Sequence, residues 1–357
     1  MRRTLAFVSV LLASAALPAH ADHQNGHTPP VGPAKARFAT DFPVLTDAEW
    51  GFRLGGFGGI RNGAPRAHIP VIFVHGNNVD HADWYLVRDD FKAAGWTDQE
   101  LWGLSYNGVG NDNGNSPSRD NPDGSAERTE MGGDGIARIT ANDVNVPDMV
   151  AFIRAVREYT GSAKFSIVAH SLGVTVARKT LKVHRELRTD LVAFVGIAGG
   201  NHGTSLCPPG TEGTVYACDE VAANTPWLDE LNGPGGSDET YPPAKWLTVY
   251  DGSGAADVAF AGPQYAQSPM LSGADNRPYP LTNHNQLRVN AAIVADYRTF
   301  IEAAEALPAA PAPKPPAVVL AEKKVPLPAT GIGGAPPGAI AMLAALAGAA
   351  ALRRPAR

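Results

Sequence analysis

A strand-like run that leads into a serine flanked by small residues restricts the fold of this chain more than any other feature. Residues 165–169 read Phe-Ser-Ile-Val-Ala and predict a strand, while a helix is predicted from Leu172 onward. The pentapeptide at residues 169–173, Ala-His-Ser-Leu-Gly, joins the two. Its small flanking residues tolerate crowding and an unusual backbone angle. We therefore expect Ser171 to sit on a sharp strand-to-helix turn.

Strand-like and helix-like segments alternate on both sides of this turn. Apolar strands are predicted at residues 70–74, 101–106, 191–198 and 246–250, and helices at residues 84–94, 142–159, 172–187 and 286–305. Such alternation is typical of a parallel sheet that carries helices on both faces. The predicted fold class is therefore α/β, with a mostly parallel central sheet.

Composition and charge limit the organisation and the partners of the chain. Its 357 residues suit either one large domain with appendages or two small ones, and the hydrophobic content of 44% suits a globular core. The formal net charge of −5 argues against binding to nucleic acid or to anionic membrane surfaces. We expect no nucleic-acid partner, and the sequence leaves the oligomeric state open.

The first 21 residues have the three parts of a secretory signal peptide. A basic start at Arg2 and Arg3 precedes the apolar residues 5–17, and Ala-His-Ala at residues 19–21 matches a cleavage site. A buried N-terminal helix is the alternative, which the order and spacing of the three parts disfavour. We expect a secreted chain whose mature form begins at Asp22. Residues 22–69 would form an N-terminal arm, loose as far as Pro43, and a turn-rich entry segment around residues 50–60.

The chain changes character after residue 305. Residues 306–326 are rich in proline and alanine and predict an extended linker. Residues 327–357 hold Leu-Pro-Ala-Thr-Gly, an apolar tail and a basic end, an order that resembles a sortase-type cell-wall sorting signal. A sortase would cut between Thr330 and Gly331 and attach the protein to the wall. A plain membrane anchor or an unprocessed tail is the alternative, although the apolar stretch is short for a bilayer.

The two cysteines and one polar segment each admit two interpretations. Cys207 and Cys218 flank a short Pro/Gly-rich loop, and export favours a disulfide between them over free or metal-bound thiols. Residues 107–135 are rich in Asn, Gly and Asp, which is typical of a functional or mobile loop. Their carboxylates suggest calcium, but the EF-hand spacing is absent, so a solvated loop is the favoured interpretation. Whether this loop covers a site as a lid is open.

A serine on such a turn is a poor nucleophile unless other groups assist it. It needs a general base, a carboxylate that orients the base, and N–H donors for the oxyanion. The acid candidates follow the predicted strand at residues 246–250 and are Asp257, Asp251 and, more distantly, Asp275. The base candidate is His284, which precedes the predicted closing helix.

Two motifs resemble those of the α/β-hydrolase lipases and esterases of bacteria. Val-His-Gly at residues 74–76 and the pentapeptide at residues 169–173 are similar to motifs of small secreted triacylglycerol lipases and of related extracellular polyhydroxyalkanoate depolymerases. The resemblance covers residues 70–305 and implies an α/β-hydrolase catalytic domain of that extent. Ala169 stands where the general Gly-x-Ser-x-Gly pattern has glycine, a departure that those lipases share.

The resemblance also implies residue roles. Ser171 would be the nucleophile, with His284 as base and Asp257 as acid, in the Ser, acid, His order of the α/β-hydrolases. The oxyanion donors would be the main-chain N–H groups of Asn77 and Leu172.

The remaining aspartate and histidine candidates are expected to have roles outside this triad, or to replace one of its members. Asp251 is the alternative acid, or it bonds a turn N–H instead. His75 and His170 are expected to pack or bond structurally, and His202 is a candidate substrate-loop residue.

The implied reaction is acyl transfer in two steps, with no metal or cofactor required. We expect a secreted carboxylic ester hydrolase that acts on acylglycerols or related esters. An extracellular polyester depolymerase is the alternative, and a catalytically inactive, surface-displayed binding protein is a second alternative from another class.

Overall fold

The computed structural model describes residues 37–48, 54–60, 66–77, 79–106, 142–208 and 216–305. The predicted signal peptide, the polar segment with its calcium candidates, the linker and the sorting signal lie outside these residues and stay predictions. The chain divides into two units, residues 1–308 and 309–357, and the described residues all belong to the first. No helix among them is long and apolar enough to cross a membrane.

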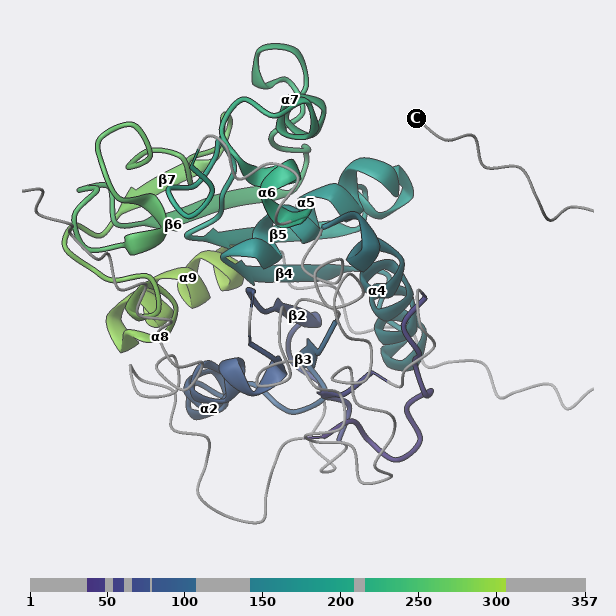
Figure 1. The fold of residues 1–357 in the computed structure, drawn as a ribbon. Helices are drawn as coiled ribbons and strands as arrows, with labels where there is room; N and C mark the ends of the chain where they lie inside the picture. The colour runs from purple at the N-terminus through teal and green to yellow at the C-terminus, as the bar shows by residue number, and fades with distance from the viewer. Residues whose placement is uncertain are drawn as a thin grey trace, which may run out of the picture. The chain divides into compact units, whose positions relative to one another are not determined.

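A mostly parallel sheet of seven strands forms the centre of the described domain (Figure 1). The order across the sheet is β1-β3-β2-β4-β5-β6-β7, and β1 pairs antiparallel with β3 whereas the other pairs are parallel. The strands are β1 (Gly56–Phe57), β2 (Val71–Val74), β3 (Leu101–Leu104), β4 (Phe165–His170), β5 (Leu191–Ile197), β6 (Lys245–Tyr250) and β7 (Asp275–Pro278). The predicted α/β class with a mostly parallel sheet is confirmed.

Helices cover both faces of this sheet (Figure 1). One face packs against α4 (Val146–Thr160) and α5 (Leu172–Val183), and the other against α2 (Tyr85–Ala93) and α9 (Ala291–Ala304). The shorter helices are η1 (His81–Trp84), η4 (Asp143–Asn145), η5 (Arg185–Leu187), α6 (Tyr216–Val221), α7 (Pro226–Asn232), η6 (Pro234–Gly236), η7 (Val258–Phe260) and α8 (Gln286–Val289).

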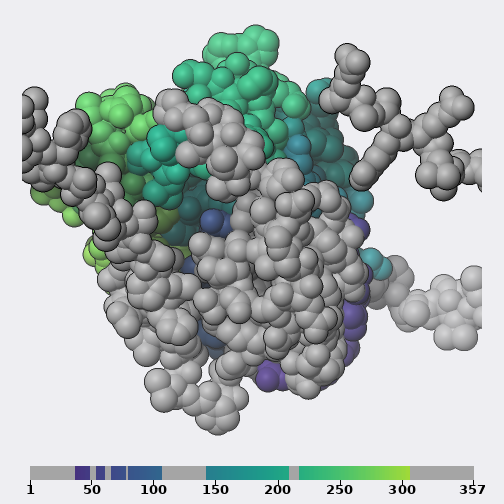
Figure 2. All heavy atoms as spheres, viewed as in Figure 1, coloured from purple at the N-terminus to yellow at the C-terminus, as the bar shows by residue number. Residues whose placement is uncertain are grey.

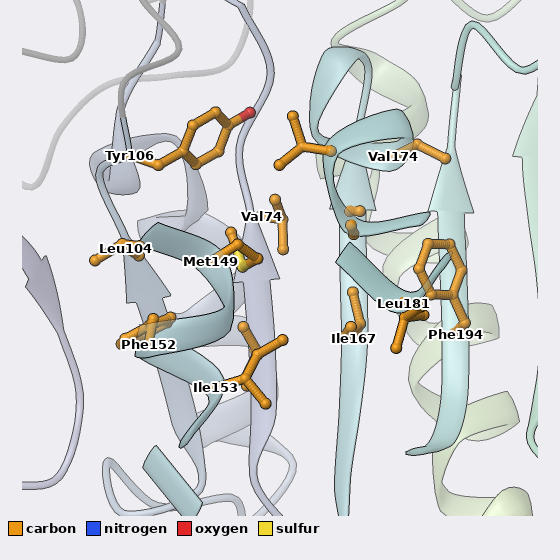
Figure 3. Packing of buried hydrophobic residues seen from close by; sticks show 14 of the residues in the cluster. Val74, Leu104, Tyr106, Met149, Phe152, Ile153, Ile167, Val174, Leu181 and Phe194 are labelled. Atoms are coloured by element: carbon orange, nitrogen blue, oxygen red, sulfur yellow. The ribbon is translucent and has the colours of Figure 1, made fainter. Parts of the chain in front are cut away.

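The alternation of side chains along β2 explains why a continuous apolar run forms a central strand. Ile72 and Val74 point into the cluster that includes α4 and α5, whereas Val71 and Phe73 point into the cluster that includes α2 and α9. All four are fully buried, as expected of a parallel strand covered on both faces. Figure 3 shows the first cluster, in which Met149, Phe152 and Ile153 of α4 lie over β2 and β3.

Part of the predicted N-terminal arm is packed on the domain. Phe42 and Leu54 are buried in the same cluster as α4, and the ring centroids of Phe42 and Trp102 are 5.0 Å apart. The amide of Ala39 donates to the carbonyl oxygen of Gly58 at 2.9 Å. The prediction of a loose arm is therefore wrong for residues 37–43, because Phe42 is buried in the core beside β3, and Leu54 of the entry segment is buried there as well.

The structure also differs from the predicted elements at both edges of the sheet and in two helices. The edge strands β1 and β7 were not expected, since β1 has two residues and β7 carries polar residues. The predicted closing helix is divided into α8 and α9 at Asn290, whose side chain accepts a hydrogen bond from the amide of Ala292 at 3.0 Å. This cap begins a new helix. The helix predicted at residues 172–187 ends as an α-helix at Val183.

Candidate active site

Ser171 lies on the sharp turn between β4 and α5. Its backbone angles are φ 56° and ψ −129°, a conformation that residues other than glycine rarely adopt. The Ser171 amide donates to the carbonyl oxygen of Ile197 at 2.9 Å, and the Ser171 carbonyl accepts from Val174 at 3.0 Å. The end of β5 and the first turn of α5 therefore hold the backbone in this conformation.

Two glycines let the loop after β2 approach this turn closely. A Cβ atom at Gly173 would lie 2.2 Å from the carbonyl oxygen of His75, and one at Gly76 would lie 2.8 Å from the Cβ atom of Ser171. Side chains at these positions would push the β2 loop and the serine turn apart. This contact explains why Gly76 and Gly173 both belong to the recognised motifs.

The predicted oxyanion donors lie beside Ser171. Asn77 follows β2 and Leu172 is the first residue of α5, and both line the same pocket as Ser171. Backbone N–H groups in the first turn of a helix have no partner within the helix, so the start of α5 favours negative charge. Asn77 and Leu172 therefore both lie in the lining of the pocket that holds Ser171, and their role as oxyanion donors stays a prediction.

His284 and Asp257 form a hydrogen-bonded pair. Nδ1 of His284 lies 2.9 Å from Oδ1 and 3.0 Å from Oδ2 of Asp257. Asp257 is 1% exposed, and its Oδ1 also accepts from the amide of Ala259 at 2.9 Å. A carboxylate only accepts, so Nδ1 of His284 donates this hydrogen bond, and in the neutral imidazole Nε2 is then the nitrogen with the lone pair.

Further contacts bring this pair to the serine turn. Nε2 of His170, the residue before Ser171, lies 3.1 Å from the carbonyl oxygen of His284, and the two histidine ring centroids are 4.6 Å apart. Phe260 lines the pocket of Ser171, and its ring centroid lies 6.2 Å from that of His284. The Asp257–His284 pair thus lies beside His170, the neighbour of Ser171, at the carboxyl end of the parallel sheet.

The other acid candidates have different partners. The Asp251 carboxylate accepts from the amides of Ala255 at 3.3 Å and Ala256 at 3.2 Å, and also from Ser253 and the amide of Leu281. Burial acts to raise the pKa of Asp251, but these hydrogen bonds outweigh it and hold the pKa below its usual value. Asp251 therefore organises the turn.

Asp275, the third candidate, lies on β7 and is exposed. It accepts from Nε of Arg277 at 2.9 Å, so this carboxylate is engaged at the edge of the sheet.

Two other histidines are engaged in structural contacts. The His75 ring is buried and stacks on Tyr106 with centroids 4.0 Å apart, and its Nε2 accepts from the amide of Tyr106 at 3.3 Å. His202 binds Oε1 of Glu239 through Nε2 at 3.1 Å and lines a separate cavity of about 730 Å³. His202 is not among the described residues that line the pocket of Ser171, although Gly200 and Thr204 of the same loop are, so its role as a substrate-loop residue stays a prediction.

The pocket of Ser171 is small and mostly apolar. Its volume is about 210 Å³. The described residues that line it are Asn77, Ser171, Leu172, Thr175, Ala198, Gly200, Thr204, Leu206, Cys207, Ala217, Cys218, Val221, Ala259 and Phe260. In Figure 2 the segment around α7, which follows α6 in the chain, stands at the top of the face. Sequence reasoning missed Phe260 and Val221, although each lies three residues from a residue it singled out.

Cys207 and Cys218 are joined by a disulfide, as the sequence favoured. The free or metal-bound thiol alternative is therefore wrong. Among the described residues, no group of three or more His, Cys, Asp or Glu side chains is arranged to hold a metal ion.

A buried ion pair connects the segments that follow Asn77 and His284. Nη1 of Arg288 on α8 donates to Oδ2 of Asp83 on η1, and both side chains are at most 2% exposed. The Arg288 guanidinium also lies 5.5 Å from the ring centroid of Trp84. The pair therefore fixes the start of the closing helices against the β2 side of the sheet.

Removal of one partner of this pair should be costly. We expect Arg288→Met to lower the free energy of unfolding by about 3–5 kcal/mol, because the Asp83 charge stays buried without this cation. Chemical denaturation measures the change. Asp83→Leu combined with Arg288→Met is the control, and it should recover much of the loss because both charges are gone. A loss below about 1 kcal/mol, the size of an exposed pair, would contradict the expectation.

The described domain has an α/β-hydrolase fold: helices cover both faces of a mostly parallel sheet, a serine lies on a strained turn after the central strand β4, and a histidine–aspartate pair lies in the loops that follow β6 and β7. The family model described as "Lipase (class 2)" matches residues 68–120 and 135–240. These residues include both recognised motifs. The match covers less than half of the chain, so over these residues the chain is similar to class 2 lipases.

Solved structures of lipases and esterases are similar to the chain at low identity. Lipase B of Aspergillus fumigatus has 18% identity and a TM-score of 0.44, with 64% of this chain and 52% of the lipase covered. The chain thus spans about half the length of that lipase. The mature lipase BlEst2 of Bacillus licheniformis has 13% identity and a TM-score of 0.44, with 69% of this chain and 96% of that chain covered.

Est1E of Butyrivibrio proteoclasticus, solved with ferulic acid bound, has 11% identity and a TM-score of 0.47, with 73% of this chain and all of that chain covered. These similarities are too distant to indicate a substrate. No protein of curated function matches the chain.

Proposed function

We propose that the chain is a secreted serine ester hydrolase that acts on acylglycerols or related esters through Ser171, His284 and Asp257. The observation that carries this proposal is the contact of both Asp257 carboxylate oxygens with Nδ1 of His284, at the same end of the sheet as the strained Ser171 turn. The disulfide supports the secretion part, because such bonds form and persist in oxidising compartments.

The proposed mechanism is a two-step acyl transfer. Oγ of Ser171 attacks the ester carbonyl while Nε2 of His284 takes its proton, and Asp257 stabilises the imidazolium that forms. The N–H groups of Asn77 and Leu172 stabilise the oxyanion. His284 then gives the proton to the departing alcohol, and a water activated by the same histidine releases the acid and regenerates Ser171.

The pocket supports an ester with an apolar acyl group. Its described lining is largely aliphatic and aromatic side chains beside the serine, a surface that favours burial of hydrocarbon. A charged acyl group would lose its hydration without a counter-charge there.

Purified full-length protein tests the proposal with three substrates. We expect turnover of tributyrin and of p-nitrophenyl butyrate at least about 10³-fold above the uncatalysed rate, and labelling of Ser171 by a fluorophosphonate. Faster release of acid from poly(3-hydroxybutyrate) particles than from tributyrin would favour the depolymerase alternative. A folded protein that neither turns over an ester nor reacts with the fluorophosphonate would contradict the proposal and favour a binding protein.

A further inference from the structure

The disulfide is part of the wall of the pocket that holds Ser171. Cys207 and Cys218 both line this pocket, and both residues are 5% exposed. They also belong to the hydrophobic cluster that includes α4 and α5, together with Leu172 and Val221. The covalent bond therefore borders the space beside the reacting serine.

One end of the disulfide is fixed to the segment that follows Asp257. The amide of Ser205 donates to the carbonyl oxygen of Ala259 at 3.0 Å, and the amide of Ala261 donates to Oγ of Ser205 at 3.1 Å. The hydroxyl of Thr204 donates to the same Ala259 carbonyl. Since Ala259 lines the pocket, the segment before Cys207 and the acid loop form one side of it.

The other end of the disulfide is fixed to α6 and, through it, to α5. Glu220 on α6 accepts from Nδ2 of Asn142 at 2.7 Å and from the amide of Asp143 at 3.2 Å. Oδ1 of Asn142 in turn accepts from the hydroxyl of Thr175 at 2.7 Å. Thr175, Cys218 and α6 residue Val221 all line the pocket, so this network holds a second part of its wall.

We propose that the Cys207–Cys218 disulfide limits the length of the acyl chain that the pocket accepts. This inference rests on the proposed function. The bond joins two walls that are each anchored by hydrogen bonds, so it resists the separation that a longer chain would need. The volume of about 210 Å³ lies below the range of about 300–1,000 Å³ typical of pockets for drug-sized ligands, which favours short acyl groups.

The test compares acyl-chain preference with and without the bond in the full-length protein. We expect Cys207→Ala/Cys218→Ala to raise the ratio of kcat/KM for p-nitrophenyl octanoate to that for the butyrate by about tenfold. Two variants at Val221 retain the disulfide and test whether the width of the pocket at this wall determines the same ratio. Val221→Ala should raise the ratio, and Val221→Phe should lower it, because they widen and narrow the pocket.

A matched control distinguishes an effect of the pocket wall on the kcat/KM ratio from an effect of lower stability on that ratio. Leu231 on α7 is fully buried but does not line the pocket, so Leu231→Ala should lower stability without changing the ratio. An unchanged ratio in the folded double cysteine variant would overturn the inference. An equal change in Leu231→Ala would do so as well.

The outcomes also separate this inference from the proposed function. If wild-type protein shows neither ester turnover nor fluorophosphonate labelling, the proposed function fails. If turnover is present but the ratio does not respond to the bond, only the disulfide inference fails. Should the double cysteine variant not fold, the two Val221 variants decide, and a ratio that responds to neither overturns the inference.

Discussion

Ser171→Ala is expected to lower kcat for ester hydrolysis by about 10⁴–10⁶-fold, because the variant lacks the hydroxyl that forms the acyl-enzyme. The remaining catalysis would come from the oxyanion donors and from substrate binding, which act without the nucleophile. Alanine keeps the Cβ atom of serine, so the φ of 56° at residue 171 causes the same steric strain in the variant as in the wild type. The amide of residue 171 can still donate to Ile197.

The measurement is kcat with p-nitrophenyl butyrate, together with the unfolding midpoint of the same sample. We expect the midpoint to change by no more than a few degrees, since only one oxygen atom is lost. Ser237→Ala is the matched control, because Ser237 is exposed and does not line the pocket. If Ser171→Ala retained turnover close to that of Ser237→Ala, another residue would have to be the nucleophile.

The sequence carried enough information to predict the central part of the fold. The strands β2, β4 and β5 are buried on both faces, so each appears as a continuous apolar run that periodicity can recognise. The serine turn is also local, since its small neighbours reflect the close approach of Gly76 and Gly173 to surrounding backbone. The position of a turn after a strand could therefore be predicted without knowledge of the rest.

Features that depend on distant segments could not be predicted in the same way. Asp83 and Arg288 are 205 residues apart in the chain, and nothing in either local sequence indicates that they form a buried pair. The pocket wall combines Phe260 and Val221 with Ser171, and their proximity depends on how the loops after β4, β5 and β6 fold back. Phe42 packs in the core although its surroundings are polar and rich in turns.

Asp257→Asn is the second large expected effect, with a fall in kcat of about 10⁴-fold. The amide that replaces the carboxylate can present its NH₂ group to Nδ1 of His284. Nδ1 would then act as the acceptor and the proton would move to Nε2. In that tautomer Nε2 has no lone pair to take the proton of Ser171, even though the site keeps its geometry.

Asp251→Asn is the matched comparison, because both aspartates are buried and both follow β6. Its carboxylate accepts from turn amides, and an asparagine keeps one of the two oxygen acceptors. We expect a kcat within about tenfold of wild type and a lower free energy of unfolding by about 1–3 kcal/mol, since some N–H groups lose an acceptor. Steady-state kinetics and denaturant unfolding of both variants test the assignment. A larger loss of kcat in Asp251→Asn than in Asp257→Asn would make Asp251 the acid, and the contact between Asp257 and His284 would then have to be structural.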